Sequence, residues 1–300
     1  MNDIVLVTED RFEDPRADPQ GKQVFVEEGL LSAAFERRGA RVGRVAWSNR
    51  AFDWSQVSVA LVQSTWDYIH RLPEFQDWLQ RTAAVTRLLN PAELILWNSD
   101  KRYLLELERA GIRIPVTRVL PAGSDLSLAT LFEELRQEEL VFKPAVSLGA
   151  RDTHRVHRDA LPEAGRTFAE LTRREAVVVQ EFLPDVLVAG EVSVVLLGGR
   201  ASHAVRKIGR AGDFRVQDHF GGRVEPHSPT EAERAFAERV VATCPVAPVY
   251  ARIDLVRHPD GGLCLMEAEL IEPELFFRLH PAGADRLAEA VERWDGVPSR

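Results

Sequence analysis

The chain has 300 residues, 45% of them hydrophobic, and a formal net charge of -8. This length and composition suit a soluble globular protein of two or three compact units. The negative charge argues against a protein that neutralises many phosphates, so we expect no nucleic-acid partner. No apolar stretch approaches the roughly 18 residues that a bilayer span needs, so we expect no membrane partner and a cytoplasmic location.

The first 92 residues alternate apolar runs with helical patterns. Buried strands are predicted at 4–8, 41–47 and 57–63, and apolar residues recur at helical spacing over 26–40 and 73–89. Such alternation is typical of a parallel α/β unit. We therefore predict that residues 1–92 form an N-terminal α/β domain on the substrate side of the protein.

The third of these strands runs into a polar and aromatic cluster. It contains Thr65, Trp66, Asp67 and Tyr68. Ligands of parallel sheets bind beyond the carboxyl ends of the strands, so the four residues are predicted to contact substrate. An aromatic cluster that only packs a domain boundary explains the same residues equally well.

The pattern changes further along the chain. A short strand at 93–97, a polar cap at Ser99 and a helix come first, and from Leu140 onward short strands are joined by loops. Helices are expected near 161–173, 229–243 and 282–294. We predict an α+β arrangement with mostly antiparallel pairing, divided into a central unit, 93–182, and a C-terminal unit, 183–300.

Two strands of the C-terminal unit, 249–256 and 263–270, flank a turn rich in Asp and Gly. If His258 pairs with Leu263 across a four-residue loop, acids and an arginine meet on one face of this hairpin. The opposite pairs are then Asp254 with Glu267 and Arg252 with Glu269.

Like charges directly opposite each other destabilise a sheet, so this face calls for a cation. Magnesium takes carboxylate oxygens and completes its shell with water and phosphates. The sequence therefore predicts that Asp254, Glu267 and Glu269 bind Mg²⁺. A solvated strand face without a metal is the alternative.

Lysine is rare in this arginine-rich chain, so its positions are informative. Lys143 ends an apolar run, an unusual place for a charge unless its ammonium meets an anion. The small residues that follow it, including Ser147 and Gly149, would let backbone amides approach phosphate oxygens. Lys101 follows a helix cap and faces either a nucleotide or solvent.

The order and spacing of these segments, from about residue 4 to residue 290, resemble the ATP-grasp superfamily. The resemblance implies an ATP-grasp fold with an N-terminal parallel α/β domain, a central domain and a C-terminal antiparallel-sheet domain. It implies ATP and Mg²⁺, with two ions usual, as cofactors. Lys101 and Lys143 would then contact phosphates, and Glu269 stands where the family more commonly has Asn.

The same resemblance assigns further roles. Main-chain groups of a hinge would hold adenine, and a nearby acid the ribose; these residues are Gln180, Glu181, Phe182 and Leu183, with Asp185 or Glu191. Arg252, helped by Arg206 or Lys207, would stabilise the transferred phosphoryl group. The glycine-rich segment 209–223 is expected to be a mobile lid, whose Arg215 and Gln217 would meet substrate.

Within the superfamily, the segments at 64–68, 97–104, 190–197, 202–207 and 251–256 most resemble the glutathione-synthetase-like branch, which includes O-ureidoserine cyclo-ligases. This implies an ATP-dependent ligase that forms a C–N bond through an acyl phosphate on a small amino-acid-like molecule. Closure of O-ureidoserine to cycloserine, in antibiotic biosynthesis, and ligation of a separate amine both stay open.

Two hypotheses from other classes compete with a ligase. One is a nucleotide-binding regulator that kept the fold without turnover, and the other is a metal-dependent hydrolase that uses the acids without ATP. The complete set of basic and acidic residues favours the ligase. Assembly into a homo-oligomer is compatible with the sequence.

Overall fold

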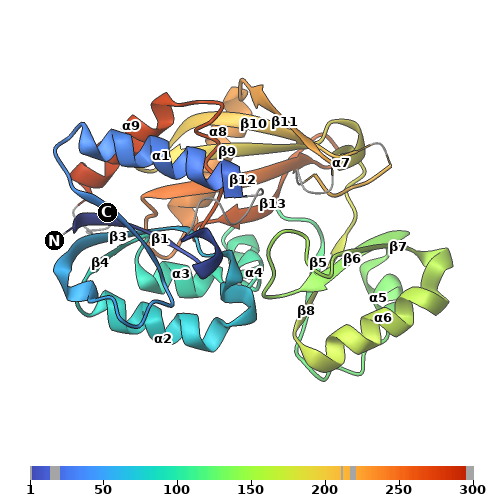
Figure 1. The fold of residues 1–300 in the computed structure, drawn as a ribbon. Helices are drawn as coiled ribbons and strands as arrows, with labels where there is room; N and C mark the ends of the chain where they lie inside the picture. Colours follow the sequence, from blue (N-terminus) through green and yellow to red (C-terminus); the bar gives the residue numbers. More distant parts are fainter. Residues whose placement is uncertain (1, 14–20, 211, 217–220, 295–300) are drawn as a thin grey trace.

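The computed structural model describes residues 2–13, 21–210, 212–216 and 221–294. These residues form one parallel and two antiparallel sheets (Figure 1). The sheets lie within the three ranges predicted from the sequence, and the mixed α/β architecture is confirmed. The domain boundaries themselves stay a prediction.

The N-terminal sheet has the strand order β2-β1-β3-β4, with every pairing parallel. Its elements in chain order are β1 (Asn2–Thr8), η1 (Asp10–Phe12), α1 (Lys22–Glu36), β2 (Val42–Ala46), η3 (Trp54–Gln56), β3 (Val57–Ser64), η4 (Trp66–His70), α2 (Leu72–Ala83) and β4 (Arg87–Leu89). The carboxyl ends of β1 and β3 lie side by side, since Thr8 pairs with Ser64.

Two predicted elements of this region were wrong. The helix predicted over 73–89 ends at Ala83, because Arg87–Leu89 pairs with β3 and so forms a strand. The strand predicted at 93–97 is instead part of helix α3 (Ala92–Asn98), in which Leu94 and Ile95 are buried. A short apolar run fits a buried helix as well as a strand, so periodicity did not separate the two.

The central sheet has the order β5-β8-β6-β7 and is antiparallel. Its elements are β5 (Thr117–Leu120), α5 (Leu128–Leu135), β6 (Glu139–Pro144), β7 (His154–His157), η5 (Arg158–Ala160), α6 (Leu161–Arg174) and β8 (Val177–Glu181). Leu131, Phe142 and Phe168 belong to a core of its own, which includes no residue of the other two sheets. Figure 1 shows this unit standing out to one side. The preceding helix α4 (Tyr103–Arg109) packs in the core of the C-terminal sheet.

The C-terminal sheet has the order β11-β10-β9-β12-β13, also antiparallel. Its elements are α7 (Asp185–Val188), β9 (Glu191–Leu197), β10 (Arg200–Ile208), β11 (Arg223–His227), α8 (Glu231–Thr243), β12 (Tyr250–Arg257), β13 (Leu263–Glu269) and α9 (Ala282–Arg293). β9 and β10 turn at Gly198 and Gly199, whose φ angles of 59° and 77° are those that a tight hairpin turn requires.

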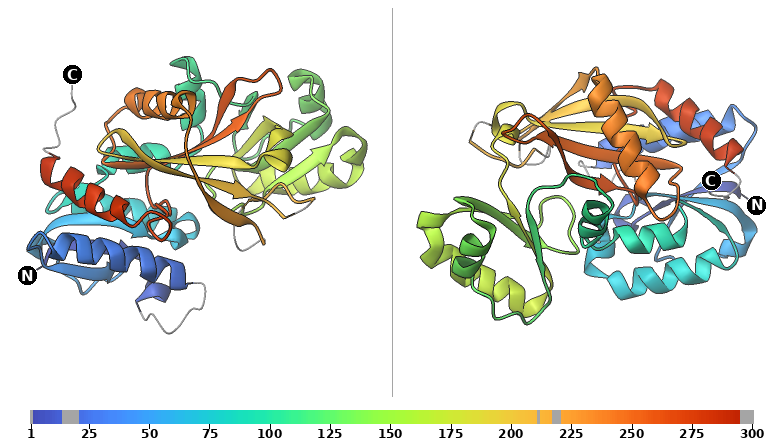
Figure 2. Two further views of the ribbon diagram at one scale, coloured as in Figure 1. Left: turned by 90° about the horizontal axis from the view of Figure 1, so that it is seen from above. Right: turned by 180° about the vertical axis from the view of Figure 1, so that it is seen from behind.

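The N-terminal and C-terminal units share a core. Leu6 and Leu31 of the first cluster with Leu197 and Leu287 of the second. Figure 2 shows α9 lying beside α1, so the end of the chain packs on its beginning. The molecule thus consists of one large body, made of these two units, and the smaller central unit.

The two faces of the C-terminal sheet differ in chemistry because side chains alternate along its strands. Val194, Ile253 and Ala268 lie in an apolar core that also contains Phe236 and Val240 of α8. The opposite face carries the polar positions that pair across β10, β9, β12 and β13, which are Lys207, Glu191, Ser193, Arg252, Asp254, Glu267 and Glu269. We call this the acid face.

The hairpin of β12 and β13 has the predicted pairs of acidic and basic residues but a different turn. Arg257, not His258, pairs with Leu263, which is a slip of one residue near the turn. A bulge between Leu255 and Asp254 takes up the extra residue, Met266, and Asp254 then lies opposite Glu267 and Arg252 opposite Glu269. The acids therefore share a face as predicted, although the predicted turn was wrong.

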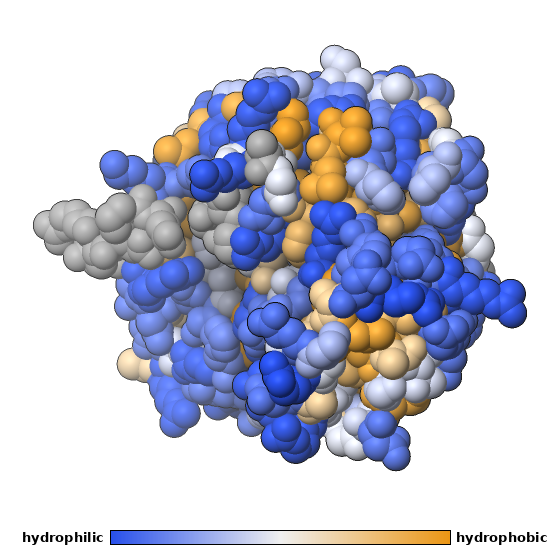
Figure 3. Space-filling view, turned by 90° about the vertical axis from the view of Figure 1, so that its right-hand side faces the viewer, coloured by the Kyte–Doolittle hydropathy of each residue, from blue (hydrophilic) through white to orange (hydrophobic). Residues whose placement is uncertain are grey.

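The surface is mainly hydrophilic on the side shown in Figure 3, with hydrophobic residues gathered in patches near the middle of this view. Among the described residues, Val188 of α7 is the most exposed large apolar side chain, at 84%. No helix in the described ranges is long and apolar enough to cross a membrane.

Candidate active site

Asp254 is the most tightly held residue of the acid face. Its Oδ1 accepts hydrogen bonds from Ser193 Oγ at 2.6 Å and Arg252 Nε at 3.1 Å. Its Oδ2 accepts from Lys207 Nζ at 2.8 Å and Arg252 Nη2 at 3.1 Å. Burial alone would raise the pKa of Asp254, but Arg252 and Lys207 outweigh burial and hold this pKa below its usual value.

Glu267 connects the acid face to the loop that follows Lys143. Lys101 Nζ lies 2.8 Å from Glu267 Oε1 and donates a hydrogen bond to Ser147 O at 2.6 Å. Burial opposes ionisation of Glu267, yet the charges of Lys101 and Lys143 lower its pKa. Lys101 is buried, so the alternative in which it faces solvent was wrong, and its contact with nucleotide stays a prediction.

Glu269 is the least compensated acid of this face. Its contact is with Arg252, whose Nη2 donates to Glu269 Oε1. Burial raises the pKa of Glu269 to about 7; Arg252 opposes this shift, and the charges of Asp254 and Glu267 add to it. A further cation at this position would stabilise the carboxylate.

Lys143 approaches the same acids from the central unit. Among the described residues it has no hydrogen-bond or ion-pair partner, and burial lowers its pKa, with Glu267 opposing the shift and Lys101 adding to it. A half-buried ammonium without a fixed partner is suited to an anionic ligand. Gly149 has a φ of 60° in the loop beyond it, and Ser147 Oγ donates to Pro144 O at 2.9 Å.

The three carboxylates of Asp254, Glu267 and Glu269 fit a magnesium ion only in part in their present arrangement. Among the residues that the structure describes, no three His, Cys, Asp or Glu side chains are arranged to hold a metal ion. Glu267 and Glu269 remain 27% and 18% exposed, whereas Asp254 is 3% exposed and already accepts four hydrogen bonds. Three carboxylates are the oxygen ligands that Mg²⁺ prefers, and Asp254 would first exchange a cationic partner.

The predicted hinge joins β8 to α7 at the border of the central unit. Glu181 N donates to Val116 O at 3.0 Å, and Phe182 N donates to Glu139 O at 3.2 Å. Gln180 Nε2 donates to Thr117 Oγ1, and Asp185 begins α7. An apolar group surrounds the hinge, which we call the hinge cluster: Phe182, Leu183, Val186, Val216, Val256 and Cys264, with Val141, Phe214 and Met266 packed against it.

Of the other predicted site residues, some lie on the acid face and some lie away from it. Lys207 holds both Asp254 and Glu191 on the acid face, which ties Glu191 to that face. Arg206 is not brought to the acids, because its Nη1 donates to Ala189 O at 2.7 Å. Arg215 pairs with Asp213 at 2.7 Å, and Gln217 lies outside the described residues.

The residues of the loop after β3 make contacts with different parts of the protein, and their contact with substrate stays a prediction. Asp67 accepts from Trp47 Nε1 at 2.7 Å and meets Arg71 at 3.0 Å, and Tyr68 stacks on Phe75. These two residues pack the N-terminal unit. Trp66 instead reaches the segment after β13, since its Nε1 donates to Glu272 O at 3.2 Å.

Some residues that build the site escaped sequence analysis. Ser193 binds Asp254, and Asn98 holds the end of β13 through Ala268 O at 2.8 Å and Leu270 N at 2.9 Å. Tyr103 OH accepts from Ala268 N at 3.0 Å. Ser193 stands among apolar residues of a buried strand, which is a usable signal. Asn98 and Tyr103 gave none, because their partners lie far away in sequence.

This fold, with Lys101 and Lys143 brought to an acidic sheet beside a hinge, defines an ATP-grasp ligase. Residues 4–90 match the family model of the D-cycloserine synthetase DcsG N-terminal domain, and residues 114–250 that of the prokaryotic glutathione synthetase ATP-grasp domain. Cycloserine biosynthesis protein DcsG of Streptomyces lavendulae is 32% identical over 265 residues, or 82% of this chain and 86% of that protein. The chain therefore belongs to the glutathione-synthetase-like ATP-grasp ligases.

Other relatives and solved structures agree with this assignment. Glutathione synthetase of Prochlorococcus marinus (strain MIT 9313) is 34% identical over 223 residues, which are 73% of this chain and 64% of that protein. The crystal structure of D-cycloserine synthetase DcsG superposes with a TM-score of 0.84 at 28% identity and covers 97% of this chain and 99% of that one.

One structural neighbour of this fold has been solved with Mg and ADP. The ATP-grasp ligase PsnB, solved with a precursor variant, Mg and ADP, has a TM-score of 0.67 and 15% identity over 97% of this chain and 98% of its own. At that identity the likeness concerns the fold.

Proposed function

We propose that this ligase activates the carboxylate of a small amino-acid-like substrate as an acyl phosphate and closes O-ureidoserine to the cycloserine ring. The observation that carries the ligase chemistry is the convergence of Lys143, Lys101 and three carboxylates on one face. The cyclising form is supported by the likeness to cycloserine synthetase, which includes the N-terminal domain.

Nucleotide would bind between the central unit and the acid face. The unpartnered ammonium of Lys143 and the ammonium of Lys101 would meet phosphates. The hinge cluster offers Val141 from one sheet and Met266 from the other as apolar walls for the base. Hinge backbone groups other than the N–H groups of Glu181 and Phe182, which already donate within the protein, would bind its edge. Ribose would be held by Asp185, which follows the hinge, in preference to Glu191, which is committed to Lys207.

The metal ligands would be Glu267 and Glu269 first, and Asp254 after it releases a basic partner. Magnesium, one ion or the two that are usual in the family, would neutralise phosphate charge when bound. The extra acid Glu269 strengthens the negative field of the site, which favours a second ion.

Arg252 is placed to stabilise the group being transferred. Its guanidinium contacts Asp254 and Glu269 and donates through Nη1 to Glu274 O at 3.3 Å, so it spans the acid face and the segment after β13. Such a fork matches a carboxylate or a phosphoryl group. Lys207 keeps Asp254 charged and oriented, whereas Arg206 supports the backbone at Ala189.

Ring closure needs no nucleophilic side chain. The carboxylate attacks the γ-phosphate and ADP leaves; the nitrogen bonded to the side-chain oxygen then attacks the acyl carbon and phosphate leaves. The carbamoyl group remains on that nitrogen, and one water removes it as carbon dioxide and ammonia. Excluding other water protects the acyl phosphate, a role that we assign to residues 209–223.

The test measures ADP, ammonia and cyclic product together. With O-ureidoserine, ATP and Mg²⁺, we expect equal amounts of ADP, ammonia and cycloserine without a second amine. ADP that forms only after an amino acid or amine is added would favour an intermolecular ligase, which the likeness to glutathione synthetase also suggests. Tight ATP binding without ADP from any carboxylate would favour a nucleotide-binding regulator.

A further inference from the structure

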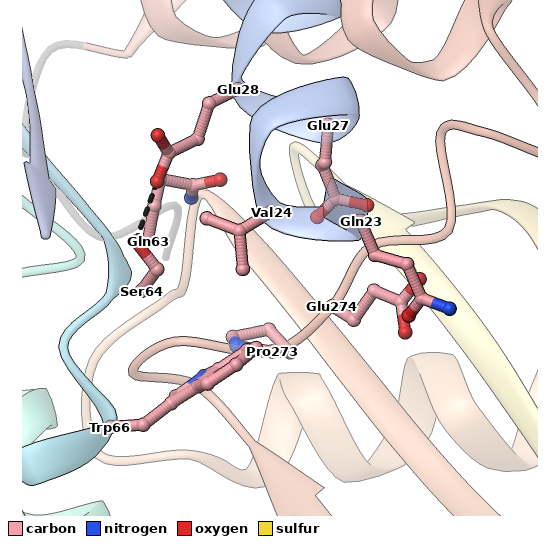
Figure 4. Close-up of a pocket in the computed structure, with 9 residues that line it drawn as sticks. All are labelled: Gln23, Val24, Glu27, Glu28, Gln63, Ser64, Trp66, Pro273 and Glu274. Atoms are coloured by element: carbon pink, nitrogen blue, oxygen red, sulfur yellow. Dashed lines mark hydrogen bonds between the residues drawn. The ribbon is translucent and has the colours of Figure 1, made fainter. Parts of the chain in front are cut away.

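A cavity opens between the N-terminal unit and the segment after β13. The first turns of α1 supply Gln23 and Glu27, the end of β3 supplies Gln63, the following loop supplies Trp66, and Pro273 and Glu274 lie across from them (Figure 4). The cavity lies close to Arg252, which donates to the backbone of Glu274. A small substrate with its carboxylate at Arg252 would therefore extend into it.

The acids that line this cavity already have partners. Glu27 accepts from Leu275 N at 2.7 Å and Phe277 N at 3.2 Å, so it fixes the segment after β13. Glu28 accepts from Ser64 Oγ at 2.5 Å, the dashed line in Figure 4, and also meets Arg44. Glu274 pairs with Arg278 at 2.8 Å. These contacts shape the wall and leave the recognition of a ligand to other groups.

Two buried polar groups behind the wall lack partners. Glu272 is 4% exposed and Thr65 is fully buried. Among the described residues, neither Glu272 Oε2 nor Thr65 Oγ1 has a hydrogen-bond partner. The bond from Trp66 Nε1 to Glu272 O at 3.2 Å joins the two segments, because Thr65 precedes Trp66. Both groups thus adjoin cavity residues, Thr65 between Ser64 and Trp66, and Glu272 before Pro273.

Burial and the nearby acids Glu269 and Glu267 raise the pKa of Glu272, so its ionised form is costly while Oε2 has no partner. In the described part of the chain no Lys, Arg or His lies within ion-pair distance of Glu272. A donor that carries positive charge would satisfy Oε2 and stabilise the ionised form of Glu272. A ligand that enters the cavity can supply one.

We infer that Glu272 and Thr65 form the subsite that recognises the α-ammonium group of an amino-acid substrate. Glu272 supplies the counter-charge and Thr65 a hydroxyl acceptor, while Arg252 faces the carboxylate on the same α-carbon. This inference rests on the proposed function. It makes the amino group, and not only the carboxylate, a condition for binding.

The test compares O-ureidoserine with its des-amino analogue, 3-(ureidooxy)propanoate, by calorimetric titration in the presence of Mg²⁺ and ADP. Wild-type protein should bind the amino compound at least about tenfold more tightly. Glu272→Gln, which keeps the size of the side chain, should bring the two within about twofold and leave nucleotide affinity unchanged. Thr65→Val should reduce the preference by a smaller factor.

Glu233→Gln is the matched control. Glu233 is another buried acid, but it caps α8 through Thr230 N at 2.8 Å and pairs with His227. Its replacement should lower thermal stability and keep the full preference for the amino compound. If Glu272→Gln does not fold, the wild-type comparison and Thr65→Val still decide the matter.

Equal binding of the two compounds by wild-type protein, or an undiminished preference in Glu272→Gln, would overturn the subsite. The proposed function fails separately. Protein that releases no ADP with any amino acid, yet loses its preference in Glu272→Gln, would refute the ligase reaction and keep the subsite. Normal ADP release by wild-type protein, together with an undiminished preference in Glu272→Gln, would refute the subsite and keep the ligase reaction.

Discussion

Lys101 Nζ lies 2.8 Å from Glu267 Oε1, so one ammonium joins a predicted phosphate contact to a predicted metal ligand. The same ammonium donates to Ser147 O in the loop of the central unit. Without nucleotide, the lysine and the carboxylate neutralise each other. When Mg²⁺ and nucleotide bind, a phosphate would become the partner of Lys101 and Mg²⁺ would become the partner of Glu267.

Replacement by methionine should therefore affect the stability of the protein differently at Lys101 and at Lys143. Lys143→Met should weaken ATP binding at least about tenfold without loss of stability, because this ammonium has no partner to lose. Lys101→Met should weaken ATP binding and also destabilise the fold by about 1–3 kcal/mol. Nucleotide titration and urea unfolding of the two variants measure this contrast. Equal stability losses would count against the assigned contacts.

Glu267 and Glu269 should differ in their importance for metal binding. Glu267→Gln should lower ADP formation at least about 100-fold, since it removes the accessible acid between the lysines. Glu269→Asn, the residue commoner in the family, should keep activity within about tenfold and shift the Mg²⁺ dependence to higher concentration. ADP release measured across a Mg²⁺ series is the readout. An identical Mg²⁺ dependence in Glu269→Asn would remove Glu269 from the ligand set.

Met266 should influence nucleotide affinity and not the acid pairing. It is the extra residue of the β13 bulge and packs on the hinge cluster. Met266→Ala removes apolar wall worth about 1–2 kcal/mol, so ATP affinity should fall about tenfold. Fluorescent nucleotide titration checks this, with Val188→Ala on exposed α7 as the control that should bind normally. An unchanged affinity would place the base elsewhere.

The acid stability of the protein should depend on His203. Burial lowers its pKa from 6.5 to about 4, and its Nε2 bonds to Leu275 O at 2.7 Å. As the pH falls, this histidine is protonated near pH 6.5 in the unfolded chain, whereas in the folded protein it stays neutral until about pH 4. The free energy of folding that depends on neutral His203 is therefore fully present above pH 6.5 and is lost as the pH falls toward 4. His203→Gln keeps a donor and should remove roughly 2 kcal/mol of the stability loss between pH 7 and 5.

Urea unfolding of both proteins at these two pH values gives the comparison. His280 stacks on His203 at 4.6 Å between ring centroids and also has a lowered pKa caused by burial, so the remaining pH dependence should not vanish. The same pH dependence in His203→Gln as in wild type would show that His203 is not the group responsible.

The hairpin illustrates what the sequence could establish. Alternation and the acidic residues were enough to place Asp254 opposite Glu267, because a buried hairpin strongly favours one face for its charges. The turn was wrong by one residue and the bulge at Met266 was unforeseen, and the two errors cancelled. A bulge depends on packing against the distant hinge cluster, which local patterns do not encode.

Long-range contacts explain the other differences. Arg87–Leu89 forms a strand because it pairs with β3, and the apolar run at 93–97 is helical although its pattern suited a strand. Local spacing left Lys101 open between a nucleotide contact and solvent, because its partners Glu267 and Ser147 lie far away in sequence. Glu272 went unnoticed because its unpartnered carboxylate emerges only when the loops after β3 and β13 are brought together.

The central claim, that the chain activates a carboxylate as an acyl phosphate, can be tested by isotope transfer. O-ureidoserine labelled with ¹⁸O in both carboxylate oxygens is incubated with ATP and Mg²⁺, and the inorganic phosphate is examined by mass spectrometry. The account predicts one ¹⁸O in each phosphate, because the carboxylate oxygen that attacks the γ-phosphate leaves with it. ADP release accompanied by unlabelled phosphate would contradict it.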